Sequence, residues 1–402
     1  MSPRFRRSAY VFFVYHDGRF VDVAKLLQGI VEEVPLRQLL ALSVLRGDAY
    51  PITIGELEIL ASIPSDGWIE LTEIDAPGLL DRFAEQGLIL STADDPSLTG
   101  LRRREEALAS GQWNVFAALY HSLTKWRDVD YRDVFGDELG ETPAVAAGLA
   151  ARHFEQHGAP PDAFHARADV LRTHELPVTT DDEELFGVLR RRRTTRLFNR
   201  DAPLSERELA TVLRTVFGCH AYAPLAPGAV ALRRTSPSGG GLHPVEAYPL
   251  VIRVEDVEAG LYHYRGGDHA LDLIVPLTTE EAESLASEFT AGQSYFASAA
   301  VLFVLTARFY RSFWKYRRHQ KAYGALLMDA AHLSQTLYLV STQLGLGAFV
   351  TYAVNGANIE DALRLDGVSE GALAVCGCGR PAGGRSPFDP EFLPYVPRET
   401  SI

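Results

Sequence analysis

The chain has few cysteines and no cluster of metal-binding residues. Its 402 residues include only Cys219, Cys376 and Cys378, which are too few for a disulfide framework. Cys376 and Cys378 alternate along an expected strand, and no further cysteine or histidine stands beside them at zinc-ligand spacing. We therefore expect buried thiols and no metal site.

Long apolar runs are also missing. No segment reaches about 18 consecutive apolar residues, the length that a membrane-spanning helix needs. Residues 1–18 are basic and then apolar, but the apolar part is short and rich in aromatic and β-branched residues. That pattern is typical of a strand and not of an export signal. The sequence predicts a cytoplasmic protein that makes no membrane contact.

Positive charge is scarce overall. The chain holds 39 lysine and arginine residues against 52 aspartate and glutamate residues, for a formal net charge of −13. A balance of this sign argues against general nucleic-acid binding. The sequence also lacks a Walker A loop and a GxGxxG fingerprint, so ATP-binding and NAD-binding folds have little support.

Arginine is nevertheless concentrated at one place. Residues 190–196 read Arg-Arg-Arg-Arg-Thr-Thr-Arg and lie at the end of an expected helix with an acidic start. Guanidinium groups this close repel one another unless an anion lies against them, and their planar donors suit a phosphate. The alternative is a solvated basic helix end, which the helix dipole also favours.

A second unusual segment is Ser-Pro-Ser-Gly-Gly-Gly-Leu-His-Pro at residues 236–244. Consecutive glycines let backbone amides approach a flat or charged ligand, and the flanking prolines stiffen the loop. A flexible surface hairpin is the alternative. Two more glycine turns follow, Gly345-Leu346-Gly347 before an apolar strand and Gly379-Arg380-Pro381 after another.

The length of the chain indicates two domains or more. Residues 1–100 are expected to form a small α/β module, in which Tyr10–Tyr15 and Phe20–Val23 pair across a turn at residues 16–19. The expected helices and final strand of this module are typical of a winged helix. A simple packing domain is the alternative.

The remaining chain divides near residues 175–185. Residues 101–180 are expected to be a helical connecting region, in which His121 is interpreted as a packing residue. Residues 181–402 mix strand and helix patterns and predict an α+β domain. Its expected strands are 247–254, 261–264, 271–275, 300–307, 348–354 and 372–378, and its expected helices are 183–193, 205–217, 280–290, 321–343 and 359–365.

Four segments, taken in order, resemble the nitroreductase superfamily of flavin enzymes. They are the arginine run at 190–196, the glycine loop at 236–244, the turn at 345–347 and the Gly-Arg-Pro element at 379–381. More narrowly they resemble the SagB-type dehydrogenases of ribosomal-peptide maturation. The resemblance covers about residues 183–390. It implies a nitroreductase-like FMN fold with a central mixed sheet flanked by helices, FMN as the cofactor, and flavin sites at the interface of a homodimer. The apolar helix expected at 321–343 suits a buried or dimer-forming element.

The resemblance also implies which residues bind FMN. Those for the phosphate are Arg192, Arg193, Thr194 and Arg196, and Thr194 stands where the family usually has serine. Either Arg380 or Arg385 is also expected to lie near the phosphate. Those for the loop that packs on the ring are Pro237, Ser238, Gly239 and Gly241. Those for the other side of the ring are Gly347, Thr351, Tyr352 and Ala353.

The SagB branch carries a Lys-Tyr pair with a catalytic role, and Lys315-Tyr316 match it. Oxidation of an azoline ring removes a carbon-bound proton and a hydride, so a lysine beside a flavin can act as the base while a tyrosine hydroxyl assists. The alternative is an amphipathic helix start with ordinary solvated charges.

The resemblance implies an FMN-dependent dehydrogenase that oxidises an azoline ring or residue of a ribosomally synthesised precursor peptide. Partner maturation enzymes and capture of the precursor's leader by the amino-terminal module would fit this function. One alternative is an NAD(P)H-dependent reductase of nitro, quinone or dehydroamino-acid substrates. Another is a non-catalytic scaffold or winged-helix regulator.

Overall fold

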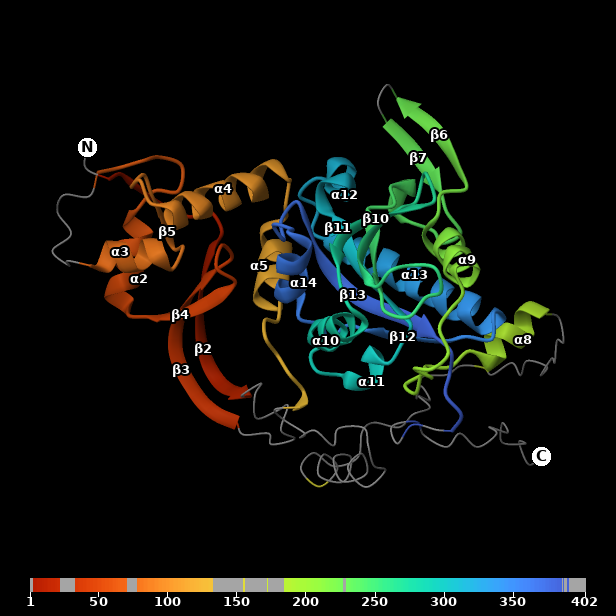
Figure 1. Ribbon diagram of the computed structural model, residues 1–402. Coiled ribbons are helices and arrows are strands. Elements are labelled where there is room, and N and C mark those ends of the chain that lie inside the picture. The colour runs from red at the N-terminus through yellow and green to blue at the C-terminus, as the bar shows by residue number, and fades with distance from the viewer. Residues whose placement is uncertain are drawn as a thin grey trace.

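The computed structural model describes residues 3–21, 33–70, 78–132, 184–226 and 229–384, together with residues 155, 172, 386 and 389. Figure 1 shows an amino-terminal lobe in red and orange beside a carboxy-terminal domain in green to blue. No helix within these ranges is both long enough and apolar enough to cross a bilayer. The domain boundary expected near residues 175–185 lies mostly outside the described residues.

The amino-terminal lobe combines short helices with two small sheets. Strands β2, β3 and β4 form an antiparallel sheet in that order, and β1 pairs with β5. In chain order the elements are β1 (Phe5–Arg7), β2 (Val11–Val21), β3 (Glu33–Ser43), β4 (Asp48–Ile52), α2 (Ile54–Ser62), α3 (Leu79–Glu85), β5 (Ile89–Ser91), α4 (Pro96–Ser110) and α5 (Val115–Leu123).

The prediction of a hairpin turn at residues 16–19 is wrong. Strand β2 runs through these residues without a turn, and Gly18 lies opposite Leu36 of β3. Every residue of β2 has a partner in β3, which has the same length of 11 residues. A long strand bonds its backbone to that partner throughout, so the tertiary partner overrides the local Asp-Gly turn signal.

The carboxy-terminal domain is built on a six-stranded sheet. The strand order is β10-β9-β8-β11-β13-β12, and each neighbouring pair is antiparallel. The strands are β8 (Val245–Val251), β9 (Gly260–Arg265), β10 (Ala270–Pro276), β11 (Val301–Arg308), β12 (Gly347–Thr351) and β13 (Glu370–Gly379). All six strands expected in this domain are thus observed, with their ends shifted by a few residues.

The sheet gains a parallel neighbour at its β12 edge. There Thr194 forms a parallel bridge with Ala348, although the six strands themselves are antiparallel. A separate hairpin, β6 (Ala221–Ala226) and β7 (Ala229–Arg233), projects from the domain in Figure 1 and was not expected from the sequence. The α+β class and the mixed sheet with flanking helices are therefore confirmed.

Helices cover the sheet, and several begin with capping boxes. Thr53 and Ser205 both accept a hydrogen bond from the backbone of a glutamate three residues on, which bonds back to them, as the sequence predicts. The helices are α8 (Glu184–Arg191), α9 (Glu206–Phe217), α10 (Thr279–Phe289), α11 (Ser294–Ala297), α12 (Phe309–Tyr316), α13 (Ala322–Gln343) and α14 (Gly356–Leu363), with a 3₁₀ turn at Gly239–Gly241.

Helix α13 runs through the middle of the domain. Leu326, Leu333 and Leu337 are buried in the main hydrophobic core, and the helix packs against β12, β13 and α9. A helix that is apolar on most of its surface is stable only when it is buried on several sides. The prediction of a buried helix at residues 321–343 is confirmed.

The two lobes share one hydrophobic core. Trp113, just before α5, is fully buried and packs on Phe309 and Phe313 of α12 with ring centroids 4.5 and 5.0 Å apart. Its indole nitrogen donates a hydrogen bond to the carbonyl oxygen of Val368 at 3.1 Å. Figure 1 shows α5 lying between the amino-terminal sheet and the carboxy-terminal domain. The lobes are therefore joined by packed side chains as well as by the chain.

Candidate functional site

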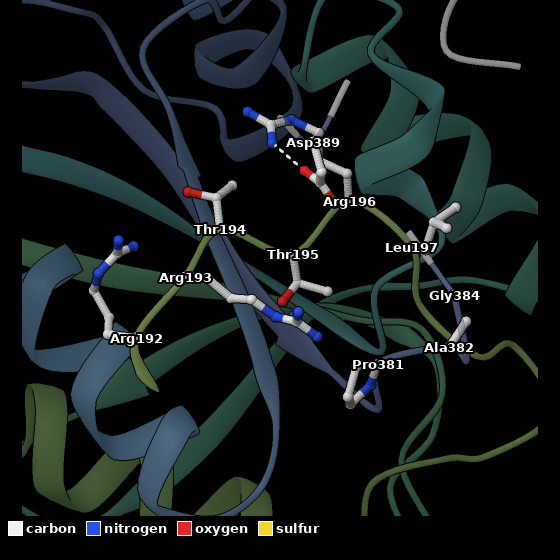
Figure 2. Close-up of a pocket in the computed structure, with 10 residues that line it drawn as sticks. All are labelled: Arg192, Arg193, Thr194, Thr195, Arg196, Leu197, Pro381, Ala382, Gly384 and Asp389. Atoms are coloured by element: carbon white, nitrogen blue, oxygen red, sulfur yellow. Dashed lines mark hydrogen bonds and ion pairs between the residues drawn. The ribbon is translucent and has the colours of Figure 1, made fainter. Parts of the chain in front are cut away.

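The arginine segment lines a cavity of about 380 Å³. Figure 2 shows Arg193 extending toward Pro381, while Arg196 points to Asp389. The lining residues are Arg192, Arg193, Thr194, Thr195, Arg196, Leu197, Pro381, Ala382, Gly384 and Asp389. A concave surface with several guanidinium donors can bind a phosphate group.

Backbone pairing on two sides holds this segment in place. On one side the Thr195 amide donates to the carbonyl oxygen of Ala348 in β12 at 2.8 Å. On the other side the Asn199 amide donates to the carbonyl oxygen of Arg380, also at 2.8 Å. A Cβ atom on Gly347 would lie 2.5 Å from the Thr195 hydroxyl oxygen, so glycine permits the close approach of this segment to β12.

Side-chain contacts orient three of the predicted phosphate-binding residues. The Thr194 and Tyr338 hydroxyl groups lie 2.9 Å apart, and the Arg192 guanidinium lies over the Tyr338 ring, 5.1 Å from its centroid. Arg196 forms an ion pair with Asp389 at 2.7 Å. An incoming phosphate would compete with that carboxylate for Arg196.

Arg380 was predicted to lie near the phosphate, but its side chain pairs with an acidic residue. Its guanidinium lies 2.8 Å from a carboxylate oxygen of Glu208 in the α9 capping box, although the next residue, Pro381, lines the arginine cavity. Arg385, the second candidate of this kind, lies outside the described residues. The structure therefore gathers Arg192, Arg193, Thr194 and Arg196 around one cavity and gives Arg380 an acidic partner.

The glycine loop lies directly against the Lys-Tyr pair. A Cβ atom on Gly240 would be 2.6 Å from the Lys315 amine nitrogen, and one on Gly239 would be 3.6 Å from the Tyr316 hydroxyl oxygen. Gly240 and Gly241 have φ angles of +66° and +67°, which favour glycine. Two segments more than 70 residues apart in the sequence thus meet, and the glycines let the loop backbone approach Lys315 and Tyr316 closely.

Asp329 of α13 anchors this loop, a role that was not predicted from the sequence. Its carboxylate accepts hydrogen bonds from the Ser238 hydroxyl at 2.5 Å and from the Gly239 amide at 3.2 Å. Burial is the largest effect on Asp329 and raises the pKa of its carboxyl group. The available signal was that Asp329 is the only acidic residue of the expected helix 321–343. Pro237 precedes the Ser238 contact and so belongs to the anchored loop.

The residues predicted for the other side of the ring lie in β12 (Gly347 and Thr351) and directly after it (Tyr352 and Ala353). The Gln293 side-chain amide donates to Thr351 at 3.3 Å and to the carbonyl oxygen of Ala353 at 3.0 Å. Tyr352 is exposed, and partial burial followed by a hydrogen bond with Tyr120 raises its pKa to about 12. Tyr352 and Ala353 line a second cavity of about 320 Å³ at the joint with α5.

His121 is held by two hydrogen bonds inside that joint. Its Nδ1 lies 2.9 Å from the Tyr323 hydroxyl, and its Nε2 lies 3.0 Å from the carbonyl oxygen of Gly367. Burial, and then the charge of Lys125, lower the pKa of His121 well below its ordinary value. Both ring nitrogens have partners, which supports the interpretation of His121 as a packing residue.

Comparison with known proteins identifies the carboxy-terminal domain. Residues 189–380 match the nitroreductase family, and this part of the chain is a nitroreductase family domain. Proteins of this family generally bind a flavin. The match contains the arginine segment, the glycine loop, the Lys-Tyr pair, the Gly345-Leu346-Gly347 turn and the start of the Gly-Arg-Pro element.

Two curated relatives carry names that refer to processing. The trifolitoxin-processing protein TfxB of Rhizobium leguminosarum bv. trifolii is 34% identical over 150 residues, which are 36% of this chain and 39% of that protein. The microcin B17-processing protein McbC of Escherichia coli is 30% identical over 152 residues, which are 37% of this chain and 53% of that protein. The chain thus spans about two fifths to half of the lengths of these relatives.

One solved structure is also similar to this chain. The Escherichia coli microcin synthetase McbBCD complex with truncated pro-MccB17 bound matches with a TM-score of 0.40 and 22% sequence identity. The match covers 60% of this chain and 92% of the chain in that complex.

Proposed function

We propose that this protein is an FMN-dependent dehydrogenase that oxidises an azoline ring or a residue within a ribosomally synthesised precursor peptide. The observation that carries the proposal is the contact of Lys315 and Tyr316 with the glycine loop inside a nitroreductase family domain. This contact brings a basic and a hydroxyl side chain to a loop that has no side chains of its own at Gly239 and Gly240.

The choice of FMN rests on two features of the chain. The arginine cavity offers guanidinium groups and the Thr194 hydroxyl for a terminal phosphate. The glycine loop offers a surface that a flat ring system can approach closely. A flavin with a single phosphate matches one such cavity and one such surface, whereas the chain has no GxGxxG fingerprint for a dinucleotide.

The chemistry assigns separate roles to Lys315 and Tyr316. Oxidation of an azoline to an azole removes one proton and one hydride from neighbouring ring atoms. The chemistry that FMN supplies when bound is the acceptance of the hydride. We assign removal of the carbon-bound proton to the Lys315 amine, and orientation of the ring to the Tyr316 hydroxyl.

The names of the relatives support a precursor peptide as the substrate. One is a trifolitoxin-processing protein and the other a microcin B17-processing protein. Reduction of small nitro or quinone compounds would not process a peptide. By the same reasoning we propose that partner maturation enzymes act with this chain, and that its amino-terminal module binds the leader of the precursor.

We also propose that the protein is a homodimer. Leu185, Phe186 and Leu189 of α8 are exposed large apolar side chains, and such a cluster is typical of an interface. Light scattering of the purified protein measures its mass in solution. A monomer at all concentrations would contradict this part of the proposal.

The first experiment identifies the cofactor. We expect the purified protein to show flavin absorbance and to release FMN on heat denaturation, and we expect the double variant Arg192→Ala/Arg196→Ala to lose it. Arg207→Ala, on the exposed side of α9, is the matched control and should retain FMN. A protein that stays colourless after FMN titration would contradict the proposed cofactor.

A second experiment tests the direction of the reaction. Anaerobic incubation with an azoline-containing peptide should bleach the flavin and remove two hydrogen atoms from the peptide, which mass spectrometry detects. Rapid bleaching by NADPH, with no oxidation of any azoline peptide, would favour the reductase instead.

A further inference from the structure

A third cavity, of about 470 Å³, lies where the two lobes meet. Its lining comes from β1, from the segment that includes Trp68, from α4, and from Arg318, which follows α12. A cavity of this size is within the range of small-molecule and side-chain binding sites. It shares no lining residue with the arginine cavity or with the cavity beside Tyr352.

The floor of this interlobe cavity contains a buried carboxylate with one unpartnered oxygen. Glu105 is only 4% exposed and lies on the same face of α4 as the buried residues Leu101 and Leu108. Its Oε1 accepts hydrogen bonds from Arg6 at 3.0 Å and from the Ala9 amide at 2.9 Å. Its Oε2 has no partner among the described residues.

Arg6 is held in a position that leaves this oxygen free. The Arg6 nitrogen that contacts Glu105 also lies 3.4 Å from the carbonyl oxygen of Ser65, and its guanidinium lies 5.1 Å from the centroid of the Trp68 ring. These contacts direct the guanidinium at Oε1. A buried charged oxygen without a donor costs free energy, so the site favours any donor that can enter the cavity.

The charges around the cavity favour a cationic donor. Its carboxylates are Asp66, Glu105 and Glu106, and its guanidinium groups are Arg6 and Arg318. Arg6 is already paired with Glu105, and Arg318 forms no ion pair within the described part of the chain. The rings of Trp68 and Tyr10 add aromatic surface that attracts cations.

We infer that the interlobe cavity binds a basic side chain, an alkylammonium or guanidinium group, of a bound peptide through Glu105 Oε2. A charge-assisted hydrogen bond to a buried carboxylate is stronger than one between neutral groups. The cavity would then select peptides with a lysine or arginine at a set position. Only the identity of the carrier as a peptide rests on the proposed function.

The position of Arg318 connects this site to the Lys-Tyr pair. Arg318 lines the cavity and follows Tyr316 by two residues, and its carbonyl oxygen accepts a hydrogen bond from the Asn114 side chain at 3.0 Å. A peptide held at Glu105 therefore lies beside the segment that carries Lys315 and Tyr316. Arg318 repels a cation at this site, so its removal should improve binding.

The test measures binding of short peptides to the full-length protein by calorimetry. We expect the tripeptide acetyl-Ala-Lys-Ala-amide to bind saturably, its norleucine analogue not to bind, and n-butylamine to bind more weakly. Glu105→Gln should weaken binding of the lysine tripeptide about tenfold or more, and Arg318→Met should strengthen it. These opposite changes separate a binding effect from a folding effect.

Three results would overturn the inference. They are absence of saturable binding, equal binding of the norleucine tripeptide, and binding of n-butylamine as tight as that of the lysine tripeptide. If Glu105→Gln does not fold, as judged by circular dichroism, an unchanged affinity in Arg318→Met also overturns it. No flavin or turnover enters this measurement, so the result is independent of the test of the proposed function.

Discussion

Lys315 is exposed, and its amine lies against Gly240 of the glycine loop. A Cβ atom at Gly240 would lie 2.6 Å from the Lys315 amine and would displace it, and the φ angle of +66° also favours glycine at this position. The Lys-Tyr pair and the glycine loop were recognised separately in the sequence, by a resemblance and by composition. Their contact could not be predicted, because it joins segments far apart in the chain.

The first residue-scale prediction concerns the proposed base. Lys315→Met should lower the rate of peptide oxidation about 100-fold or more, because general-base catalysis contributes on this scale. The FMN content should be unchanged, since the arginine cavity lies elsewhere in the domain. Lys321→Met, at the start of α13, is the matched control. Full activity in Lys315→Met would remove this residue from the mechanism.

The second residue-scale prediction concerns His121 and pH. Burial holds the pKa of His121 well below 6.5 in the folded protein, while the unfolded chain takes up a proton near pH 6.5. The unfolded state thus binds more protons at lower pH, so the free energy of unfolding falls as pH drops below about 6.5, by up to about 1.4 kcal/mol per pH unit.

The variant His121→Gln isolates this effect. The stability advantage of the wild type over the variant should be largest at pH 7 and above, and should shrink toward pH 5. Burial also lowers the pKa of His243 to about 4, whereas the hydrogen bond to Glu246 raises that of His263. Both remain in the variant, so they cancel in the comparison. Denaturant titrations measure the difference, and a difference that is constant with pH would contradict the prediction.

At the scale of secondary-structure elements, local sequence signals were reliable where the element is self-contained. The capping boxes at Thr53 and Ser205 need only residues three apart, and both are present. The expected turn at residues 16–19 failed because the partner strand β3 decides whether β2 continues. The parallel contact of Thr194 with β12 also depends on a distant partner.

The element-scale prediction tests that contact. Gly347→Ala should lower the free energy of unfolding by about 1–3 kcal/mol, the usual cost of overpacking, and should weaken FMN binding by displacing the arginine segment. The atoms nearest to the new Cβ all belong to the Thr195 side chain, at 2.5–2.7 Å. The double variant Gly347→Ala/Thr195→Gly should therefore lose less stability than the sum of the single variants.

Denaturant titration and FMN fluorescence measure the two effects. Thr195→Gly alone serves as the control for removal of the threonine. Strictly additive losses would show that the added methyl group acts elsewhere, and not through the contact between residue 195 and β12.

At the scale of the whole molecule, the two lobes are expected to unfold together. Trp113 is fully buried among side chains of the carboxy-terminal domain, and the main core contains Tyr10 and Leu45 of the amino-terminal lobe. Parts that share a core lose their packing at the same time. The nominal division at residue 100 is therefore not expected to be an unfolding boundary.

The matching prediction is made for Trp113→Ala. It should cost about 3–5 kcal/mol, the usual range for truncation of a buried aromatic residue, and it should shift a single transition instead of splitting it. Trp314→Ala is the control, because Trp314 is 46% exposed and its loss should cost within about 0.5 kcal/mol. Circular dichroism and hydrogen exchange report on the two lobes. Separate transitions for the lobes would contradict the shared core.

The sequence by itself determined the order of the chemical segments and most of the elements that carry them. The arginine run, the glycine loop and the Lys-Tyr pair are local patterns, which can be recognised from neighbouring residues alone. Only the tertiary structure decided that the glycine loop lies on Lys315, that Asp329 anchors Ser238, and that Glu208 is the partner of Arg380. These contacts depend on long-range packing, which brings together residues that no pattern of neighbours relates.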